Sequence, residues 1–74
     1  MIFTKRFKPQ PLLDVAVESW LRECGLEIPV STNLEPDVIR ARIKAALNAS
    51  DWYVYTWDDP LTDEFVFSAG PPDK

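Results

Sequence analysis

The chain has 74 residues, of which 46% are hydrophobic and 12% are aromatic, and its formal net charge at pH 7 is −4. It has no histidine and a single cysteine, Cys24, which excludes an internal disulfide, a Cys/His zinc site and a histidine general base. A chain this short buries only about 60% of the surface that its unfolded form exposes. We therefore expect one compact domain over residues 1–70, followed by a disordered tail over residues 71–74.

The distribution of apolar and charged residues bears on location. The opening sequence MIFTKRFKPQ is basic but precedes no apolar run of signal-peptide length, and no segment approaches the roughly 20 apolar residues of a membrane span. A cytoplasmic protein without membrane contact is expected. The basic N-terminal segment contrasts with residues 51–68, which contain several acidic residues and no basic one.

A short strand is predicted over residues 2–7, IFTKRF. Side chains alternate along a strand, so Phe3 and Phe7 share one face. The opposite face then carries Ile2, Thr4 and Arg6. Pro9 and Pro11 follow and end the strand, because proline cannot donate a hydrogen bond to a sheet.

A first helix is predicted to follow, with Pro11 in its first turn, where the missing N–H removes no hydrogen bond. Apolar residues then recur at the spacing of one helix face. They are Leu13, Ala16, Val17, Trp20, Leu21 and Cys24. Gly25 is placed to end the helix in a left-handed conformation, with Leu26 in contact with Leu21 as in a Schellman motif. Cys24 is predicted to be a buried thiol, because reactive cysteines lie at exposed, electropositive sites.

The connector LEIPVSTN is expected to pack Ile28 and Val30 against the core. A second helix is predicted to begin near Asn33 or Glu35 and to end over residues 48–51. Its buried face consists of Ile39, Ile43, Ala46 and Leu47. Its outward face carries Asp37, Arg40, Arg42 and Lys44.

Residues 51–65, DWYVYTWDDPLTDEF, begin a predicted C-terminal hairpin. The segment 59–62, Asp-Pro-Leu-Thr, fits a type I turn, with an acceptor side chain at the first position and proline at the second. A four-residue loop at this point pairs residue 58 with 63, 56 with 65, 54 with 67 and 52 with 69. One face then carries Trp52, Val54, Thr56, Phe65, Phe67 and Ala69. The other face carries Tyr53, Tyr55, Trp57, Glu64, Val66 and Ser68.

The first hairpin face is uncharged and matches the apolar faces of the two helices, so it is predicted to form the core. An isolated hairpin is only marginally stable in water and must pack against another element. If residues 2–7 add a third strand, the fold is α+β with the element order β-α-α-β-β. Two amphipathic helices then pack on one face of a small antiparallel sheet that ends in the C-terminal hairpin.

The other hairpin face is the candidate partner-binding surface, because it combines aromatic rings with acidic side chains. The predicted partner-binding residues are Tyr53, Tyr55, Trp57, Asp58, Asp59, Asp63 and Glu64. Tyrosine and tryptophan are frequent at interface hot spots, since each offers a large apolar area with a polar tip. Two alternatives remain. The rings reflect the preference of aromatic residues for strands and are covered by the N-terminal segment or a second copy, or they line a ligand pocket.

The acidic residues alone do not predict a metal site or an active site. The sequence DDPLTDE lacks the alternating ligands and the central glycine of an EF-hand loop. A glycosidase-like pair of carboxylates needs an enclosed cleft, and 74 residues leave little chain to build one. We expect no cofactor, no metal ion and no catalytic residue, so the protein is predicted not to be an enzyme.

Nucleic-acid binding is a further alternative, through Lys5, Arg6, Lys8, Arg40 and Lys44. The net charge disfavours it, because a protein at −4 is repelled by a polyanion unless its basic residues are segregated. On a helix with ~100° per residue, Arg42 points away from the other two basic residues of the second helix. No direct nucleic-acid binding is expected.

These observations favour a non-catalytic binding protein whose acidic aromatic hairpin occupies a basic surface on another protein. Where that surface binds nucleic acid, the carboxylates would take the place of phosphates and the rings that of stacked bases, which gives a competitive inhibitor. In size and charge the chain is similar to small acidic inhibitors encoded by mobile elements, including anti-defence proteins. The alternative hypothesis is a small structural or assembly subunit that dimerises or docks through the same hairpin face.

Overall fold

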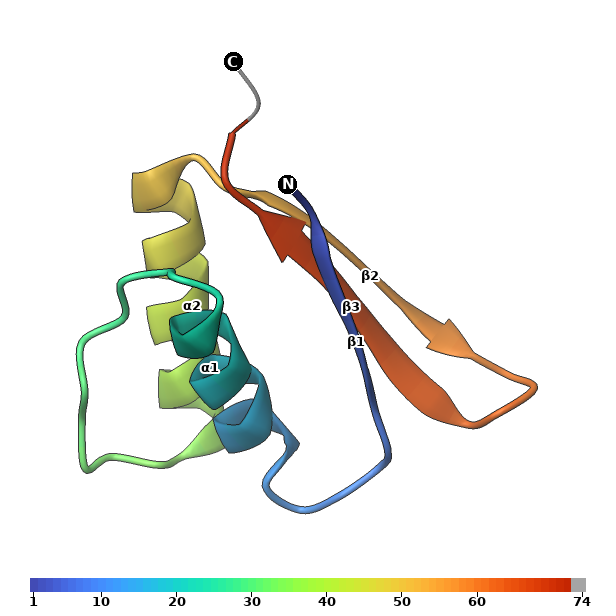
Figure 1. Cartoon of the computed structure of the whole chain (residues 1–74). Coiled ribbons are helices and arrows are strands. Elements are labelled where there is room, and N and C mark those ends of the chain that lie inside the picture. The colour runs from blue at the N-terminus through green and yellow to red at the C-terminus, as the bar shows by residue number, and fades with distance from the viewer. Residues whose placement is uncertain (73–74) are drawn as a thin grey trace.

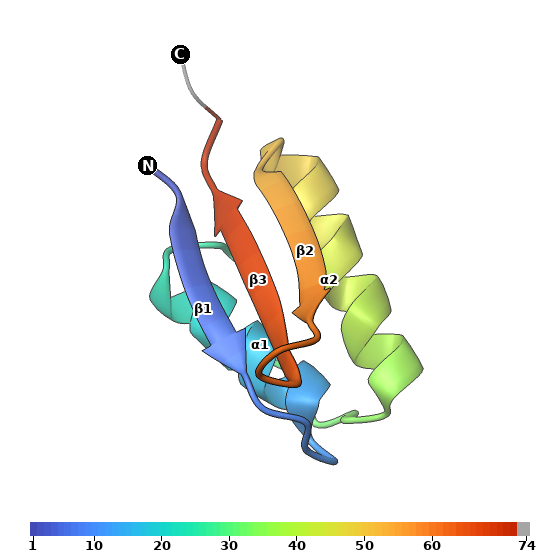
Figure 2. The ribbon, with the colours of Figure 1, turned by 90° about the vertical axis from the view of Figure 1, so that its right-hand side faces the viewer.

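The computed structural model describes residues 1–72, which form two helices and three strands in the order β-α-α-β-β (Figure 1). The elements are β1 (Phe3–Phe7), α1 (Leu13–Glu23), α2 (Pro36–Ser50), β2 (Tyr53–Asp59) and β3 (Glu64–Gly70). The strands form one antiparallel sheet in the order β1-β3-β2. Both helices lie on one face of this sheet, which confirms the predicted α+β fold (Figure 2).

The predicted tail covers residues 71–74. In the predicted tail, residues 71 and 72 belong to no helix or strand, and residues 73 and 74 lie outside the described part of the chain. Neither helix within residues 1–72 is long and apolar enough to cross a membrane.

The hairpin register differs from the predicted one by two residues. Residue 54 pairs with 69, 56 with 67 and 58 with 65, so the loop spans residues 60–63 instead of 59–62. Asp63 has a φ of 55° and closes the loop in the left-handed conformation, which short polar side chains tolerate better than most. Asp59 stays in the strand, and its Oδ1 accepts a hydrogen bond from the backbone N–H of Leu61 at 3.0 Å. Because side chains alternate with a period of two, this shift leaves the two predicted faces unchanged.

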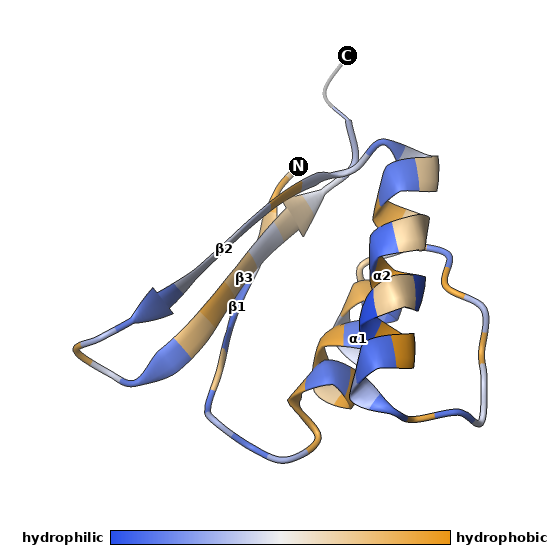
Figure 3. Ribbon diagram, turned by 180° about the vertical axis from the view of Figure 1, so that it is seen from behind, coloured by the Kyte–Doolittle hydropathy of each residue, from blue (hydrophilic) through white to orange (hydrophobic). Residues whose placement is uncertain are grey.

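The central strand β3 carries much of the core, with β1 on one side and β2 on the other. On the face toward the helices, Phe67 is 7% exposed and Ala69 is fully buried. The ring of Trp20 on α1 meets the rings of Phe7 and Phe67 edge to face, with centroids 6.0 and 5.7 Å apart. Hydrophobic residues recur along β3 and α1, whereas the strand ends that flank the hairpin loop are hydrophilic (Figure 3).

The two predicted core residues on β2 are wrong, since Val54 is 42% exposed and Thr56 is also exposed. Trp52, just before the strand, is half-buried and packs against the core as predicted. The cause of the exposure on β2 is the strand order: β2 lies at the edge of the sheet, and the helix layer does not cover it fully. The layers converge where α2 passes into β2 and diverge toward the hairpin loop (Figures 1 and 3).

The end of α1 has the predicted Schellman geometry. Gly25 has a φ of 106°, and the N–H of Leu26 donates to the carbonyl of Leu21 at 3.0 Å. The start differs, since the helix begins at Leu13 and leaves Pro11 in the preceding turn. The thiol of Cys24 is half-buried instead of buried, and burial raises its pKa, with a smaller contribution from Glu23.

The connector between the helices packs only one of its two predicted residues. Ile28 is 6% exposed, but Val30 is 86% exposed. Arg22 donates from Nε to the carbonyl of Ile28 at 3.0 Å and from Nη2 to that of Pro29 at 2.9 Å. These bonds hold the connector against α1 up to residue 29, and the chain then turns outward.

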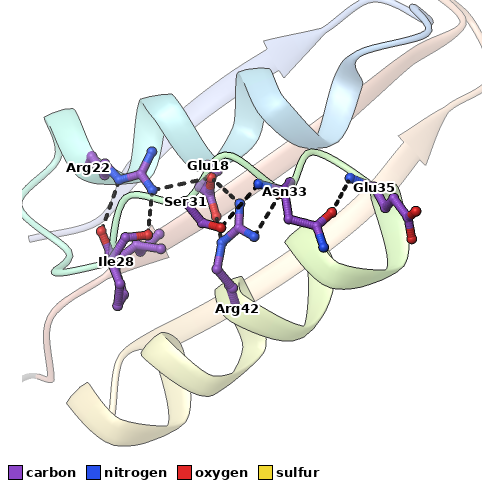
Figure 4. A network of polar contacts seen from close by, with 8 residues as sticks. Glu18, Arg22, Ile28, Ser31, Asn33, Glu35 and Arg42 are labelled. Atoms are coloured by element: carbon purple, nitrogen blue, oxygen red, sulfur yellow. Dashed lines mark hydrogen bonds and ion pairs between the residues drawn. The ribbon is translucent and has the colours of Figure 1, made fainter.

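The helices are joined by a buried ion pair that was not predicted (Figure 4). The Glu18 side chain is 4% exposed, and both of its carboxylate oxygens accept hydrogen bonds from Arg42 at 3.0 Å. Arg22 also approaches this carboxylate at 3.3 Å, and Arg42 donates to the carbonyl of Asn33 at 2.9 Å. The outward position predicted for Arg42 is therefore wrong. Its side chain is only 15% exposed, because it satisfies a buried carboxylate from the facing helix. The other predicted features of α2 are confirmed, including the four residues of its buried face.

We predict that Glu18→Gln lowers the free energy of unfolding by about 2–3 kcal/mol, because it leaves two arginine side chains without their buried counter-charge. Urea denaturation measures this change. Glu23→Gln, on an exposed position of the same helix, is the matched control and should change stability by less than about 0.5 kcal/mol. Equal urea midpoints for Glu18→Gln and the unmodified chain would contradict the role given to this pair.

A second prediction concerns the C-terminus of α2. Asp51 has a φ of 57° there, and its carboxylate lies at the negative end of the helix dipole. Glycine takes this conformation without strain, so Asp51→Gly should raise the free energy of unfolding by about 0.5–1 kcal/mol. Asp51→Asn removes only the charge and should give a smaller gain in the same denaturation assay. A loss of stability in Asp51→Gly would show that the conformation is not strained.

Candidate partner-binding surface

One face of the sheet points away from the helices (Figure 2). The strand register places three aromatic side chains of β2 on this face. Tyr53 is 49% exposed, Tyr55 58% and Trp57 38%. The rings of Tyr55 and Trp57 lie against each other, with centroids 5.3 Å apart and planes tilted by 38°. We call these three residues the outer aromatic row. Their placement on this face follows the predicted alternation, and their role in binding stays a prediction.

The neighbouring strand β3 also contributes to this outer face. Val66 is 1% exposed and Ser68 is 7% exposed, although no helix lies over them. Val66 is paired with Trp57 on one side and with Arg6 on the other, so the side chains of the two outer strands shield it. Ser68 shares a hydrogen bond of 2.9 Å with Thr4 on β1. Part of the tryptophan surface therefore stabilises the sheet, and the two tyrosines remain the more accessible rings.

Arg6 on β1 reaches across the outer face to two of the acidic residues named above. Its Nη1 lies 2.9 Å from Oδ2 of Asp59 and 3.5 Å from Oε1 of Glu64. The Arg6 guanidinium and the backbone N–H of Leu61 hold the pKa of the Asp59 carboxyl below its usual range. Because the arginine is on a strand distant in sequence, the hairpin alone gave no sign of this pairing. These two carboxylates are compensated within the fold.

The other two acidic residues predicted to bind a partner are placed differently. Asp58 is exposed and shares the helix side of the sheet with Phe65, opposite to the outer aromatic row. Asp63 is exposed in the hairpin loop. Within residues 1–72, neither forms an ion pair. The seven predicted site residues are thus close along the hairpin but do not form one acidic patch.

The basic residues considered for nucleic acid are also divided. Arg6 is paired as described, and Nε of Arg40 lies 3.1 Å from Oδ1 of Asp14. In the part of the chain that the structure describes, three lysines form no ion pair. They are Lys5, Lys8 and Lys44, on β1, after β1 and on α2 respectively. The arginines are occupied by internal carboxylates, and the lysines are spread over separate elements.

The acidic side chains do not come together around a common point. Among residues 1–72, no group of three cysteine, aspartate or glutamate side chains is placed to hold a metal ion. The arrangement offers a surface for contact: exposed rings, an edge strand and two uncompensated carboxylates at the hairpin end.

The pairing of Arg6 with Asp59 makes the free energy of unfolding depend on pH in the acidic range. A carboxyl with a lowered pKa in the folded state stabilises the fold fully above its unfolded pKa of ~4, and this contribution is lost as pH falls through the folded value. We predict that Asp59→Asn, which keeps the turn hydrogen bond, shows a shallower loss of stability below about pH 4 than the unmodified chain. Urea denaturation over a pH series measures this. Arg6→Gln should flatten the curve in the same way, and parallel curves for all three proteins would refute the linkage.

Comparisons with known proteins found no relative of this chain. No family model matches the chain, and no curated protein and no solved structure matches it at a significant level. The geometry of the outer sheet face is therefore the basis for any proposal of function.

Proposed function

We propose that this protein is a small, non-catalytic binding module that docks on another protein through the outer aromatic row. The observation that carries the proposal is the accessibility of three neighbouring rings on a sheet face without a helix layer. Large aromatic side chains at the surface are costly to leave in water and supply much of the affinity at interfaces. The two tyrosines are the expected anchors, because they are the most exposed of the three.

The position of β2 in the sheet supports the same proposal. Among the described residues, β2 pairs with β3 on one side only, so part of its backbone N–H and C=O groups face outward. A partner that contacts the rings can also bond to this edge. The edge strand and the outer aromatic row thus form one continuous docking surface.

The finer proposal is that the partner presents a basic surface. A net charge of −4 and the two uncompensated carboxylates, Asp58 and Asp63, favour a cationic partner by long-range attraction. If that surface is a nucleic-acid channel in a cytoplasmic protein, docking blocks it and the module acts as an inhibitor. Direct binding of nucleic acid by the module itself has no place in this proposal, nor has contact with a membrane.

Substitutions that keep the strand test the proposal. We expect Tyr55→Thr to weaken the affinity for a captured partner at least tenfold, as hot-spot tyrosines do, while the β-branched residue preserves strand propensity. Surface plasmon resonance on the purified pair measures the affinity. Val30→Ala, at an exposed apolar residue of the connector, is the control and should leave the affinity unchanged. Equal affinities for both variants would refute docking through the row.

The basic character of the partner has its own test. Asp58→Lys combined with Asp63→Lys reverses the two charges that have no internal partner, and leaves Arg6 with Asp59 and Glu64 intact. The association rate should fall, and its salt dependence should become weaker. An unchanged salt dependence would contradict a basic partner, but it would leave the proposal of a binding module standing.

A second candidate function is assembly with a copy of the same chain. It is favoured by the same open edge, since antiparallel pairing of two β2 strands would continue the sheet across a twofold axis. Light scattering on the purified protein separates the two possibilities. A dimer that dissociates in Tyr55→Thr indicates assembly, whereas a monomer at high concentration indicates a foreign partner.

A further inference from the structure

A second surface lies on the other side of the sheet, between the sheet and the helix layer. It is a groove of about 500 Å³. Its walls come from α1, α2 and the facing side of β2 and β3, and most of the lining residues are apolar. They are Leu13, Val17, Ile43, Leu47, Val54, Phe65 and Phe67. The volume lies within the range of about 300–1,000 Å³ typical of small-molecule sites.

The groove exists because β2 is an edge strand that the helices do not fully cover. Its deep walls are nearly buried, with Val17 4% exposed and Leu47 7% exposed. Its rim is open, since Val54 is 42% exposed although it points to the helix side. The layers also diverge toward the hairpin loop (Figure 3). Hydrophobic surface is thus continuous from the core to the solvent along one path.

The polar residues of the groove stand on α2 and at the start of α1. Arg40 and Asp14 neutralise each other at 3.1 Å. Lys44 and Asn48 follow at one-turn intervals along α2, and both are exposed. Within residues 1–72, Lys44 forms no ion pair. The groove therefore combines an apolar interior with one uncompensated cation and an amide at its rim.

We propose that this groove binds an amphipathic small molecule with an aliphatic body and an anionic head, such as a medium-chain carboxylate. The alkyl chain lies against Leu13, Val54 and Phe65, which are the partly or largely exposed apolar residues of the groove, and removes their apolar surface from water. The carboxylate accepts hydrogen bonds from the Lys44 ammonium and the Asn48 amide. A neutral head would leave Lys44 without a counter-charge, and a cationic head would be repelled by it.

This site is independent of the outer aromatic row. None of Tyr53, Tyr55 and Trp57 lines the groove, and the two surfaces lie on opposite faces of the sheet. Failure of one proposal leaves the other standing, and an experiment on the groove needs no protein partner.

Decanoate is the probe for the first experiment, titrated below its aggregation concentration into protein with isotope-labelled methyl groups. We expect saturable shifts in the methyl signals of Leu13 and Val54, and smaller shifts for the distant Val30. Shortening the chain to octanoate should weaken binding by about two- to fourfold per methylene removed. Absence of shifts, or shifts spread evenly over exposed methyl groups, would overturn the proposal.

Two variants then test the contacts of the alkyl chain and those of the carboxylate separately. Val54→Trp, tolerated at an edge strand, fills the groove and should abolish binding. Lys44→Gln should weaken decanoate by about two- to fivefold, as expected for one exposed ion pair, and leave decanol unchanged. Lys8→Gln, at an exposed lysine outside the groove, is the matched control. Equal affinity of the unmodified protein for decanoate and decanol would refute recognition of an anionic head.

Discussion

The pairing of β3 on both of its edges is the constraint on which the rest of the structure depends. β3 receives β1 on one side and β2 on the other, and its last five residues are all buried. Its residues Phe67 and Ala69 belong to the core under the helices, and Val66 and Ser68 are the buried residues at the centre of the outer face. The helices need only cover the inner side. A chain of 74 residues can build a stable domain in this way because one strand serves two surfaces.

The same arrangement explains why a charged side chain lies across the outer face of the sheet. With a single helix layer, the outer face has no second layer to shield Val66, so long side chains from both neighbouring strands lie across it. Arg6 does this while it compensates Asp59 and Glu64. On the opposite side of the molecule, Glu18 and Arg42 join the helices to each other. All four arginines thus hold elements together, and the carboxylates left uncompensated near the hairpin loop give that end its negative character.

The element order and the division of residues between sheet faces could be predicted, because periodicity of 3.6 or 2 is a local property of the sequence. The sheet face of Tyr55 was predicted correctly although the hairpin register was not, because a shift of two residues preserves the alternation of side chains. The burial of Glu18 and the pairing of Asp59 could not be predicted, as each depends on an arginine distant in sequence. The exposure of Val54 depends on the order of strands in the sheet, which no local pattern records.

The helix layer and the sheet are held together by apolar side chains. Among the hydrogen bonds and ion pairs of residues 1–72, none joins a helix to a strand. Contact between the layers is therefore made by apolar side chains around Trp20, whose ring meets Phe7 and Phe67 edge to face. Among the described residues, cohesion of the two layers therefore depends on hydrophobic burial and close packing. Because hydrophobic attraction weakens on cooling, the contact between the layers should weaken in the cold.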